Sequence, residues 1–185
     1  MVKRLVVTGY RPHELGIFNE THPGVAIIKE ALRQQLLAQL DEGLEWVIVS
    51  GQLGVEAWTC DVVRELKEEY THLKYAVLLP FQGQEERWNE TNKAKFEEMV
   101  LKADFSTYLT NRPYAGPWQF QKKDEFLFEN SDGILFVYDE DNEGSPKFTK
   151  RAAERFQEQH PYELFVIDAF QLQLIQEDMQ REQWD

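Results

Sequence analysis

Cysteine, proline, glycine and positive charge are all scarce in this sequence. Its 185 residues include 1 Cys, 7 Pro and 10 Gly, and 33 Asp and Glu residues stand against 20 Lys and Arg residues. The single thiol, Cys60, excludes an intramolecular disulfide, which fits a reducing compartment, and we expect a cytoplasmic protein. The formal net charge of −13 argues against nucleic acid and anionic membranes as partners, because both attract basic protein surfaces.

Long apolar segments and recognised catalytic patterns are missing as well. No stretch approaches the about 18 apolar residues of a membrane span. Residues 1–9 are basic and then apolar, but the run is short and ends in Gly-Tyr-Arg-Pro, so we expect a strand and no signal peptide. The four histidines are dispersed, and we expect no metal site. There is no G-x-S-x-G elbow, Walker loop or pair of catalytic carboxylates, which leaves enzyme activity open.

The chain alternates short β-rich runs with longer helical patterns. We predict strands at 5–8, 46–50, 75–79, 103–110, 132–139 and 163–167, and helices at 23–42, 55–70, 84–102, 118–130, 146–159 and from 169 onward. In the fourth strand we expect Phe105, Tyr108 and Leu109 to face inward. Continuous apolar strands that alternate with helices predict an α/β fold with a doubly wound, mostly parallel sheet of about six strands and helices on both faces. Without a linker or repeat, we expect one domain over residues 1–185.

Ligands of such sheets bind beyond the carboxyl ends of the strands, where the strand order reverses. The loops expected there hold most of the glycines together with Arg11 and Arg112. A cationic, glycine-rimmed pocket in an acidic chain suits an anionic small molecule better than a polymer. The residues that we expect to bind it are Thr8, Gly9, Arg11, Gly51, Gln52, Gly54, Glu56, Pro80, Phe81, Arg112, Tyr114, Gln119, Gly144 and Ser145.

The segment from Ser50 to Glu56 joins a strand to a helix through two glycines. Gly51 allows a positive φ, and Gly54 would let a ligand approach the amino end of the helix, where free N–H groups favour phosphate. Glu56 could cap those N–H groups or accept from a ribose hydroxyl pair. The alternative is a plain turn, since a lone G-x-x-G pattern is weak evidence. We expect Gly51→Asp or Glu56→Ala to damage function, and Glu56→Ala to cost little folding stability.

The segment from Glu143 to Pro146 is a second candidate. Ser at the N-cap position followed by Pro at the first helical position is a favourable helix start, and it would again direct N–H groups toward the site. A well-formed cap without a ligand is the alternative.

Short motifs along nearly the whole chain resemble those of the bacterial YpsA family. They are Thr8-Gly9-Tyr10-Arg11-Pro12-His13, Ser50-Gly51-Gln52-Leu53-Gly54-Val55-Glu56, Pro80-Phe81-Gln82, Arg112-Pro113-Tyr114, Gln119-Phe120, Ser131-Asp132-Gly133 and Gly144-Ser145-Pro146-Lys147. That family is similar to a wider group with the DNA-processing protein DprA and the LOG-type phosphoribohydrolases. The resemblance implies a Rossmann-like fold that binds nucleotides. The Pro-Gly-Gly-x-Gly-Thr loop of the hydrolases is absent, and Glu143-Gly144-Ser145-Pro146 stands in its place.

Three functions follow from these patterns. The first is a nucleotide-sensing module that binds a nucleotide, ADP-ribose or NAD and reports it to a protein partner or through a homodimer; the resemblance also implies a link to bacterial cell division. The second is a hydrolase of N-glycosidic bonds in nucleotides, with Glu14, Glu56 or Glu143 as the general acid/base. The third is a DNA-associated protein, by analogy with DprA.

Overall fold

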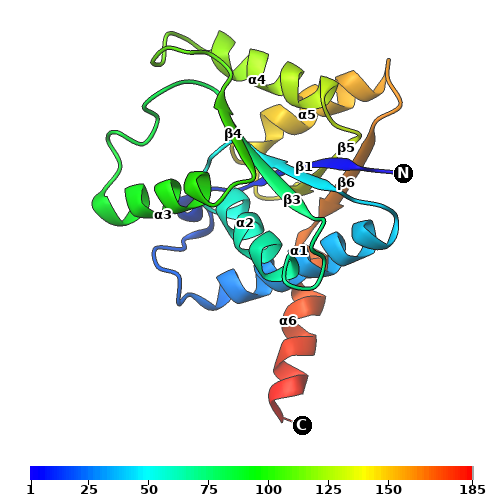
Figure 1. The fold of residues 1–185 in the computed structure, drawn as a ribbon. Helices are drawn as coiled ribbons and strands as arrows, with labels where there is room; N and C mark the ends of the chain where they lie inside the picture. The colour runs from blue at the N-terminus through cyan, green and yellow to red at the C-terminus, as the bar shows by residue number, and fades with distance from the viewer. Residues whose placement is uncertain (185) are drawn as a thin grey trace.

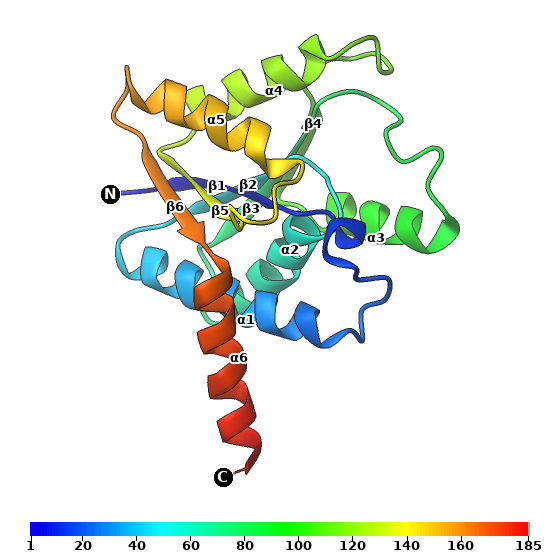
Figure 2. The same cartoon turned by 180° about the vertical axis from the view of Figure 1, so that it is seen from behind.

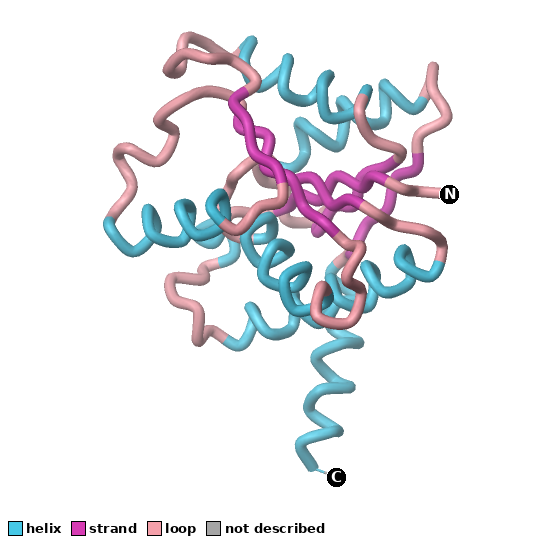
Figure 3. The backbone as a smooth tube through the Cα atoms, in the orientation of Figure 1, coloured by secondary structure: helices cyan, strands magenta, loops and turns pink. Residues whose placement is uncertain are grey.

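Six short apolar strands form one sheet in which every neighbouring pair is parallel. The computed structural model describes residues 1–184, and the sheet order is β4-β3-β2-β1-β5-β6 (Figures 1 and 3). The strands are β1 Arg4–Gly9, β2 Trp46–Val49, β3 Lys74–Leu79, β4 Phe105–Tyr108, β5 Gly133–Val137 and β6 Glu163–Ile167. The chain builds outward from β1 to β4 and then returns to β5 on the other side of β1. The strand order therefore reverses between β1 and β5, where a ligand is expected.

The helices cover the two faces of the sheet unequally. They are the 3₁₀ helix η1 Pro12–Leu15 and the α-helices α1 Pro23–Asp41, α2 Val55–Leu66, α3 Glu90–Leu101, α4 Trp118–Glu129, α5 Pro146–Gln157 and α6 Ala169–Trp184. One face carries α1, α2, α3 and α6, and the other carries only α4 and α5 (Figures 1 and 2). Right-handed crossovers explain this division, because α1 to α3 connect strands laid down in one direction and α4 and α5 follow the reversal.

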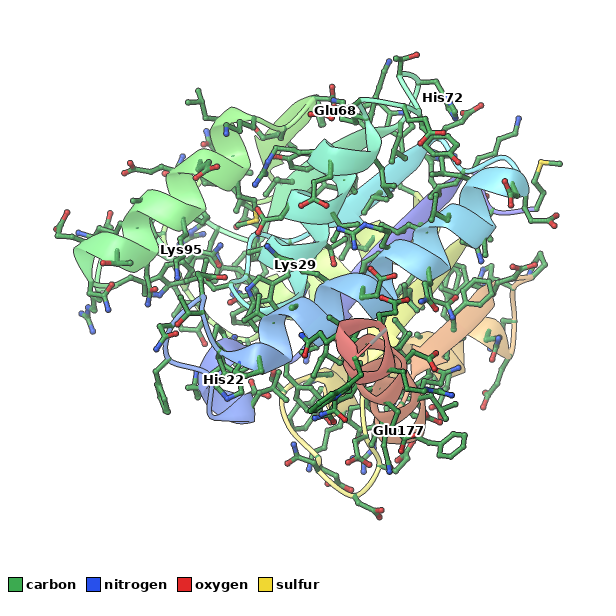
Figure 4. The ribbon with its side chains drawn as sticks, turned by 90° about the horizontal axis from the view of Figure 1, so that it is seen from below. His22, Lys29, Glu68, His72, Lys95 and Glu177 are labelled. Carbon is green, nitrogen blue, oxygen red and sulfur yellow. The ribbon has the colours of Figure 1, made fainter. Side chains whose placement is uncertain are left out.

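Each face of the sheet has its own apolar layer. Leu5 and Val7 of β1 pack in the layer under α1 and α2, while Val6 between them belongs to the layer under α4 and α5. This alternation is the two-residue period of a strand that is buried on both sides. On the first face, an ion pair of 3.1 Å joins Lys29 of α1 to Asp61 of α2 (Figure 4). There α6 packs on α1 through Ile175 and then projects beyond the rest of the fold (Figure 1).

The predicted α/β class, the parallel sheet and the helices on both faces are confirmed, and two details were wrong. The third helix begins at Glu90 and not near residue 84, because the side chain of Asn89 accepts the N–H of Asn92 and caps the helix there. Phe105 and Tyr108 do not face inward, and 52% and 41% of their surfaces are exposed. They lie on β4, an edge strand with a neighbouring strand on one side only.

Candidate ligand-binding site

A cavity of about 1020 Å³ lies over the carboxyl ends of β1 and β2, between α4 and α5. We call it the α4–α5 cavity. Thr8 and Gly9 of β1 and Ser50 after β2 are at the sheet end of this cavity, and Phe120 of α4 and Phe148 of α5 are on its walls. This position beside the β1–β5 reversal is where an open parallel sheet is expected to bind its ligand.

The cavity exists because α4 and α5 meet at one end and diverge at the other. Near their carboxyl ends, the rings of Phe128 and Phe156 lie with centroids 5.5 Å apart. At the amino ends, Phe120 packs instead on Phe81 beyond β3, and Ser145 bonds to Glu14 beyond β1. The two amino ends are thereby fixed to different loops, and the space between them opens over the ends of the strands.

The charges around this cavity are divided between its two walls. Arg151 and Arg155 come from α5, whereas α4 contributes a cluster of mixed sign: Lys123, Asp124, Glu125 and Glu129. Arg11 after β1 also lines the cavity. Within residues 1–184, these three arginines form no ion pair, unlike Lys123, which lies 3.2 Å from Asp124. Four acidic and four basic side chains line the cavity, so it is nearly neutral in a strongly acidic chain.

Glu56 is buried in the cavity floor with its carboxylate fully engaged. Only 3% of the residue is exposed. The carboxylate accepts the Ser50 N–H at 2.6 Å, the hydroxyls of Ser50 and Thr8 at 3.1 and 2.9 Å, and the Gln52 N–H at 3.3 Å. These contacts join β1, β2 and α2. They argue against the expectation that Glu56→Ala costs little folding stability. The two hydroxyls give their protons to Glu56, which leaves their oxygens able to accept from a ligand.

The two glycines of the β2–α2 turn serve the chain's own packing. Gly51 and Gly54 have φ angles of 91° and 84°. A Cβ on Gly54 would collide with the Tyr10 carbonyl oxygen and lie 2.9 Å from the Arg11 Cα. The Val55 N–H also donates to the Tyr10 oxygen at 3.1 Å. We predicted that a ligand would approach the backbone at Gly54. In the structure, the loop after β1 occupies that position.

The amino end of α5 is capped from another segment. Pro146 occupies the first turn as predicted, but the side chain of Ser145 makes no capping bond of its own. Instead its hydroxyl and N–H donate to the carboxylate of Glu14 in η1, at 2.7 and 3.1 Å. Gly144 fits beside this contact, since a Cβ there would meet Glu14 and the Tyr10 ring. The sequence predicted that the N–H groups at this helix end would bind a ligand. In the structure, the Glu14 carboxylate accepts the Ser145 N–H instead.

Several predicted binding residues lie outside this cavity and support the loops. Phe81 is buried with its ring centroid 5.2 Å from that of Tyr114. Gln119 is fully buried and accepts the Ala115 N–H at 2.6 Å. Pro80 is buried and Arg112 is exposed. Glu143 is exposed and pairs with Lys147 at 3.1 Å, and this hydrogen bond lowers the pKa of the Glu143 carboxyl. Of the predicted binding residues, the α4–α5 cavity gathers Thr8, Gly9, Arg11, Gln52, Glu56 and Ser145.

A second cavity of about 630 Å³ lies on the other side of Arg11 and Gln52. We call it the α2–α3 cavity, because it lies between the loop after β1 and the amino ends of α2 and α3. Gly54 and Trp88 are among its lining residues, and Arg11 and Gln52 line both cavities. The two cavities are therefore neighbours at the carboxyl edge of the sheet.

The sequence interpretation missed the α5 wall. Phe148, Arg151 and Arg155 are three and four positions apart, the spacing that places side chains on one face of a helix. That spacing was visible in the sequence. The spacing alone did not indicate a ligand site, because a solvent-exposed helix face shows the same pattern.

The chain is similar to known proteins over nearly its full length. The model of the YpsA family, described as the YspA SLOG family, matches residues 5–172. A UPF0398 protein of Lysinibacillus sphaericus is 54% identical over 97% of this chain and 100% of its own length. The UPF0398 protein YpsA of Bacillus subtilis is 45% identical over 96% of this chain and 98% of its own length. These matches span the motifs that line the α4–α5 cavity.

Among residues 1–184, no helix is both long and apolar enough to cross a membrane. In the same part of the chain, no group of three or more His, Cys, Asp or Glu side chains is placed to hold a metal ion.

Proposed function

The chain belongs to the YpsA family, a SLOG family, and from this premise we propose that it binds a nucleotide or nucleotide derivative, such as ADP-ribose or NAD, in the α4–α5 cavity. Membership of the SLOG family links the chain to nucleotide-related functions. The location of the cavity over the carboxyl ends of β1 and β2 agrees with the way parallel α/β sheets bind such ligands.

One observation supports this proposal above the others. Arg11, Arg151 and Arg155 reach the same cavity from two separate segments, and none of them forms an ion pair within residues 1–184. In a chain with 33 acidic residues, arginines that remain without a carboxylate partner are suited to an external anion. The guanidinium group matches phosphate oxygens in a bidentate geometry. The hydroxyl oxygens of Thr8 and Ser50 would accept from ribose hydroxyls at the floor.

The contacts of the three glutamates that the sequence offered as general acid or base favour binding and sensing over hydrolysis by those residues. A general acid or base must lie within hydrogen-bond reach of the substrate. Glu56 already accepts from four donors, Glu14 holds Ser145, and Glu143 pairs with Lys147 outside the cavity. Such a sensor would report the bound ligand to a protein partner or to a second copy of the chain. Bacterial cell division is one process in which this sensor would act. The charge of −13 disfavours DNA.

Calorimetry with AMP, ADP-ribose and NAD tests the proposal directly. We expect saturable binding, weakened about tenfold or more when Arg151→Ala and Arg155→Ala are combined, since two charge-assisted contacts are lost. Arg181→Ala is the matched control, because Arg181 lies on α6, is largely exposed and pairs with Asp178. Absence of binding at millimolar ligand by the folded protein would overturn the proposal. Chromatography after prolonged incubation should detect no released base.

A further inference from the structure

We propose that the α2–α3 cavity is a second half-site for the same ligand, so that the protein takes a two-ended nucleotide whose diphosphate crosses Arg11 and Gln52 and whose second ring lies against Trp88. This inference rests on the proposed function and narrows its ligand to a nucleotide with a second ring beyond the diphosphate. A mononucleotide would fill only the α4–α5 cavity. A dinucleotide such as NAD would use both cavities.

The walls of the α2–α3 cavity are fixed to one another by Glu20. Its carboxylate accepts the indole N–H of Trp58 at 3.1 Å and pairs with the Lys95 ammonium at 2.8 Å. Glu20 belongs to the loop after β1, Trp58 to α2, and Lys95 to α3, where Figure 4 labels it. One carboxylate thus joins three separate elements around the cavity.

The chemistry of this cavity suits a flat heterocyclic ring with an amide group at its edge. The Trp88 ring is held by an edge-on contact with Phe96, with centroids 5.7 Å apart and planes at 87°. Asn89 and Asn92 line the same cavity, and within residues 1–184 the Asn92 side chain has no hydrogen-bond partner. An indole face stacks on heterocycles, and side-chain amides pair with the edges of a base or a carboxamide. Lys95 is paired with Glu20, so within residues 1–184 the lining cation left for phosphate is Arg11, at the border with the α4–α5 cavity.

The two cavities are complementary in chemistry and share only Arg11 and Gln52. The α4–α5 cavity offers hydroxyl oxygens and guanidinium groups, which suit ribose and phosphate. The α2–α3 cavity offers an indole and amides, which suit a ring. Gln52 is held in place by its own contacts, through its N–H to Glu56 at 3.3 Å and its side chain to Gln84 at 3.3 Å. The unpaired Arg11 between the two cavities is positioned for a diphosphate that links the two halves of one ligand.

Tryptophan fluorescence separates the two half-sites, because Trp58 and Trp88 line the α2–α3 cavity and no tryptophan lines the α4–α5 cavity. We expect NAD to change the tryptophan emission and to bind about tenfold more tightly than AMP, the gain of one stacked ring. AMP should bind by calorimetry and leave the emission unchanged. An emission change with AMP alone would contradict the assignment of the two halves.

Two variants make the test decisive. Trp88→Ala should reduce NAD affinity to that of AMP and leave AMP affinity unchanged. Asn92→Ala should also lower NAD affinity without loss of the helix cap, because the bond to Asn89 comes from the Asn92 backbone N–H, which Ala keeps. Trp118→Ala, on α4 and outside both cavities, is the control. If AMP and NAD bind equally to all forms, the second half-site is wrong and the proposed function stands. If the folded protein binds neither, both proposals fail.

Discussion

Glu14 in η1 holds Ser145 at the amino end of α5, although the two residues are 131 positions apart. One carboxylate oxygen accepts the Ser145 hydroxyl at 2.7 Å and the other accepts its N–H at 3.1 Å. The contact crosses the point between β1 and β5 where the strand order reverses. A carboxylate of the protein therefore neutralises the helix end that faces the ligand cavity. A phosphate that approaches Ser145 would meet this negative charge.

Replacement of Glu14 by Gln should strengthen the binding of phosphorylated ligands. The amide keeps the length of the side chain and removes the charge. Charges at exposed helix ends are worth about 0.3–1 kcal/mol, so we expect about a two- to fivefold gain in affinity by calorimetry and a small loss of thermal stability. Glu143→Gln is the control, because Glu143 lies on the same loop as Ser145, pairs with Lys147 and lines neither cavity. An unchanged affinity for Glu14→Gln would exclude competition between this carboxylate and the ligand.

Replacement of Glu56 by Ala should destabilise the fold strongly. Four donors of Thr8, Ser50 and Gln52 would lose their common acceptor in a buried place. Each buried donor left without a partner costs about 1–3 kcal/mol, and we expect denaturant unfolding to show a loss of about 3 kcal/mol or more. Glu90→Ala, whose side chain is 97% exposed, should stay within about 0.5 kcal/mol of the parent. Equal stabilities of the two variants would contradict a structural role for Glu56.

The fold and the floor of the site followed from the sequence because both depend on local patterns. Apolar strands that end in glycine-bearing turns specify a parallel sheet, and the carboxyl ends of its strands gather Thr8, Gly9 and Gln52 at one edge. The residues of α4 and α5 that form the walls of the cavity could not be predicted from local patterns. Which side chains of α4 and α5 face each other depends on the path of α4 across the sheet from β4 to β5, and no local pattern encodes that path.

Phe81 and Gly54 show the same limit of local patterns. The sequence does not distinguish an aromatic residue that stacks on a ligand at a strand end from one that packs against other rings, as Phe81 does with Tyr114 and Phe120. A glycine at a helix start looks alike whether a ligand or, as at Gly54, the backbone of Tyr10 approaches it. Tertiary packing decides both cases.

The glycines with positive φ should differ sharply in their tolerance of Ala. Gly54→Ala would combine a φ of 84° with a collision against the Tyr10 carbonyl, which is backbone and cannot rotate away. Gly16→Ala is the matched control, because its φ is 67° and nothing lies within 4 Å of the added Cβ. The left-handed conformation alone costs about 1–2 kcal/mol. Denaturant unfolding should therefore show about this loss for Gly16→Ala and a clearly larger one for Gly54→Ala. Similar losses would show that the approach of Tyr10 is not tight.

The Cys60 thiol should make stability fall in alkaline solution. Cys60 is fully buried on α2, and burial raises the pKa of its thiol well above the ordinary value. In the unfolded chain the thiol ionises near pH of about 8.5. Above that pH the unfolded state binds fewer protons than the folded state, so the free energy of unfolding decreases as pH rises, by up to about 1.4 kcal/mol per pH unit.

Denaturant unfolding between pH 7 and pH 9.5 measures this slope, and Cys60→Ala should reduce it whatever that variant does to stability at pH 7. Tyr75 has a pKa raised to about 12 by burial and starts from an ordinary value of 10.0, so it contributes mainly above this window. In the folded protein, the buried thiol should also resist alkylation at pH 9, because the thiolate is the reactive form. Equal slopes for the parent and Cys60→Ala, or rapid alkylation of the folded chain, would show that the thiol reaches solvent.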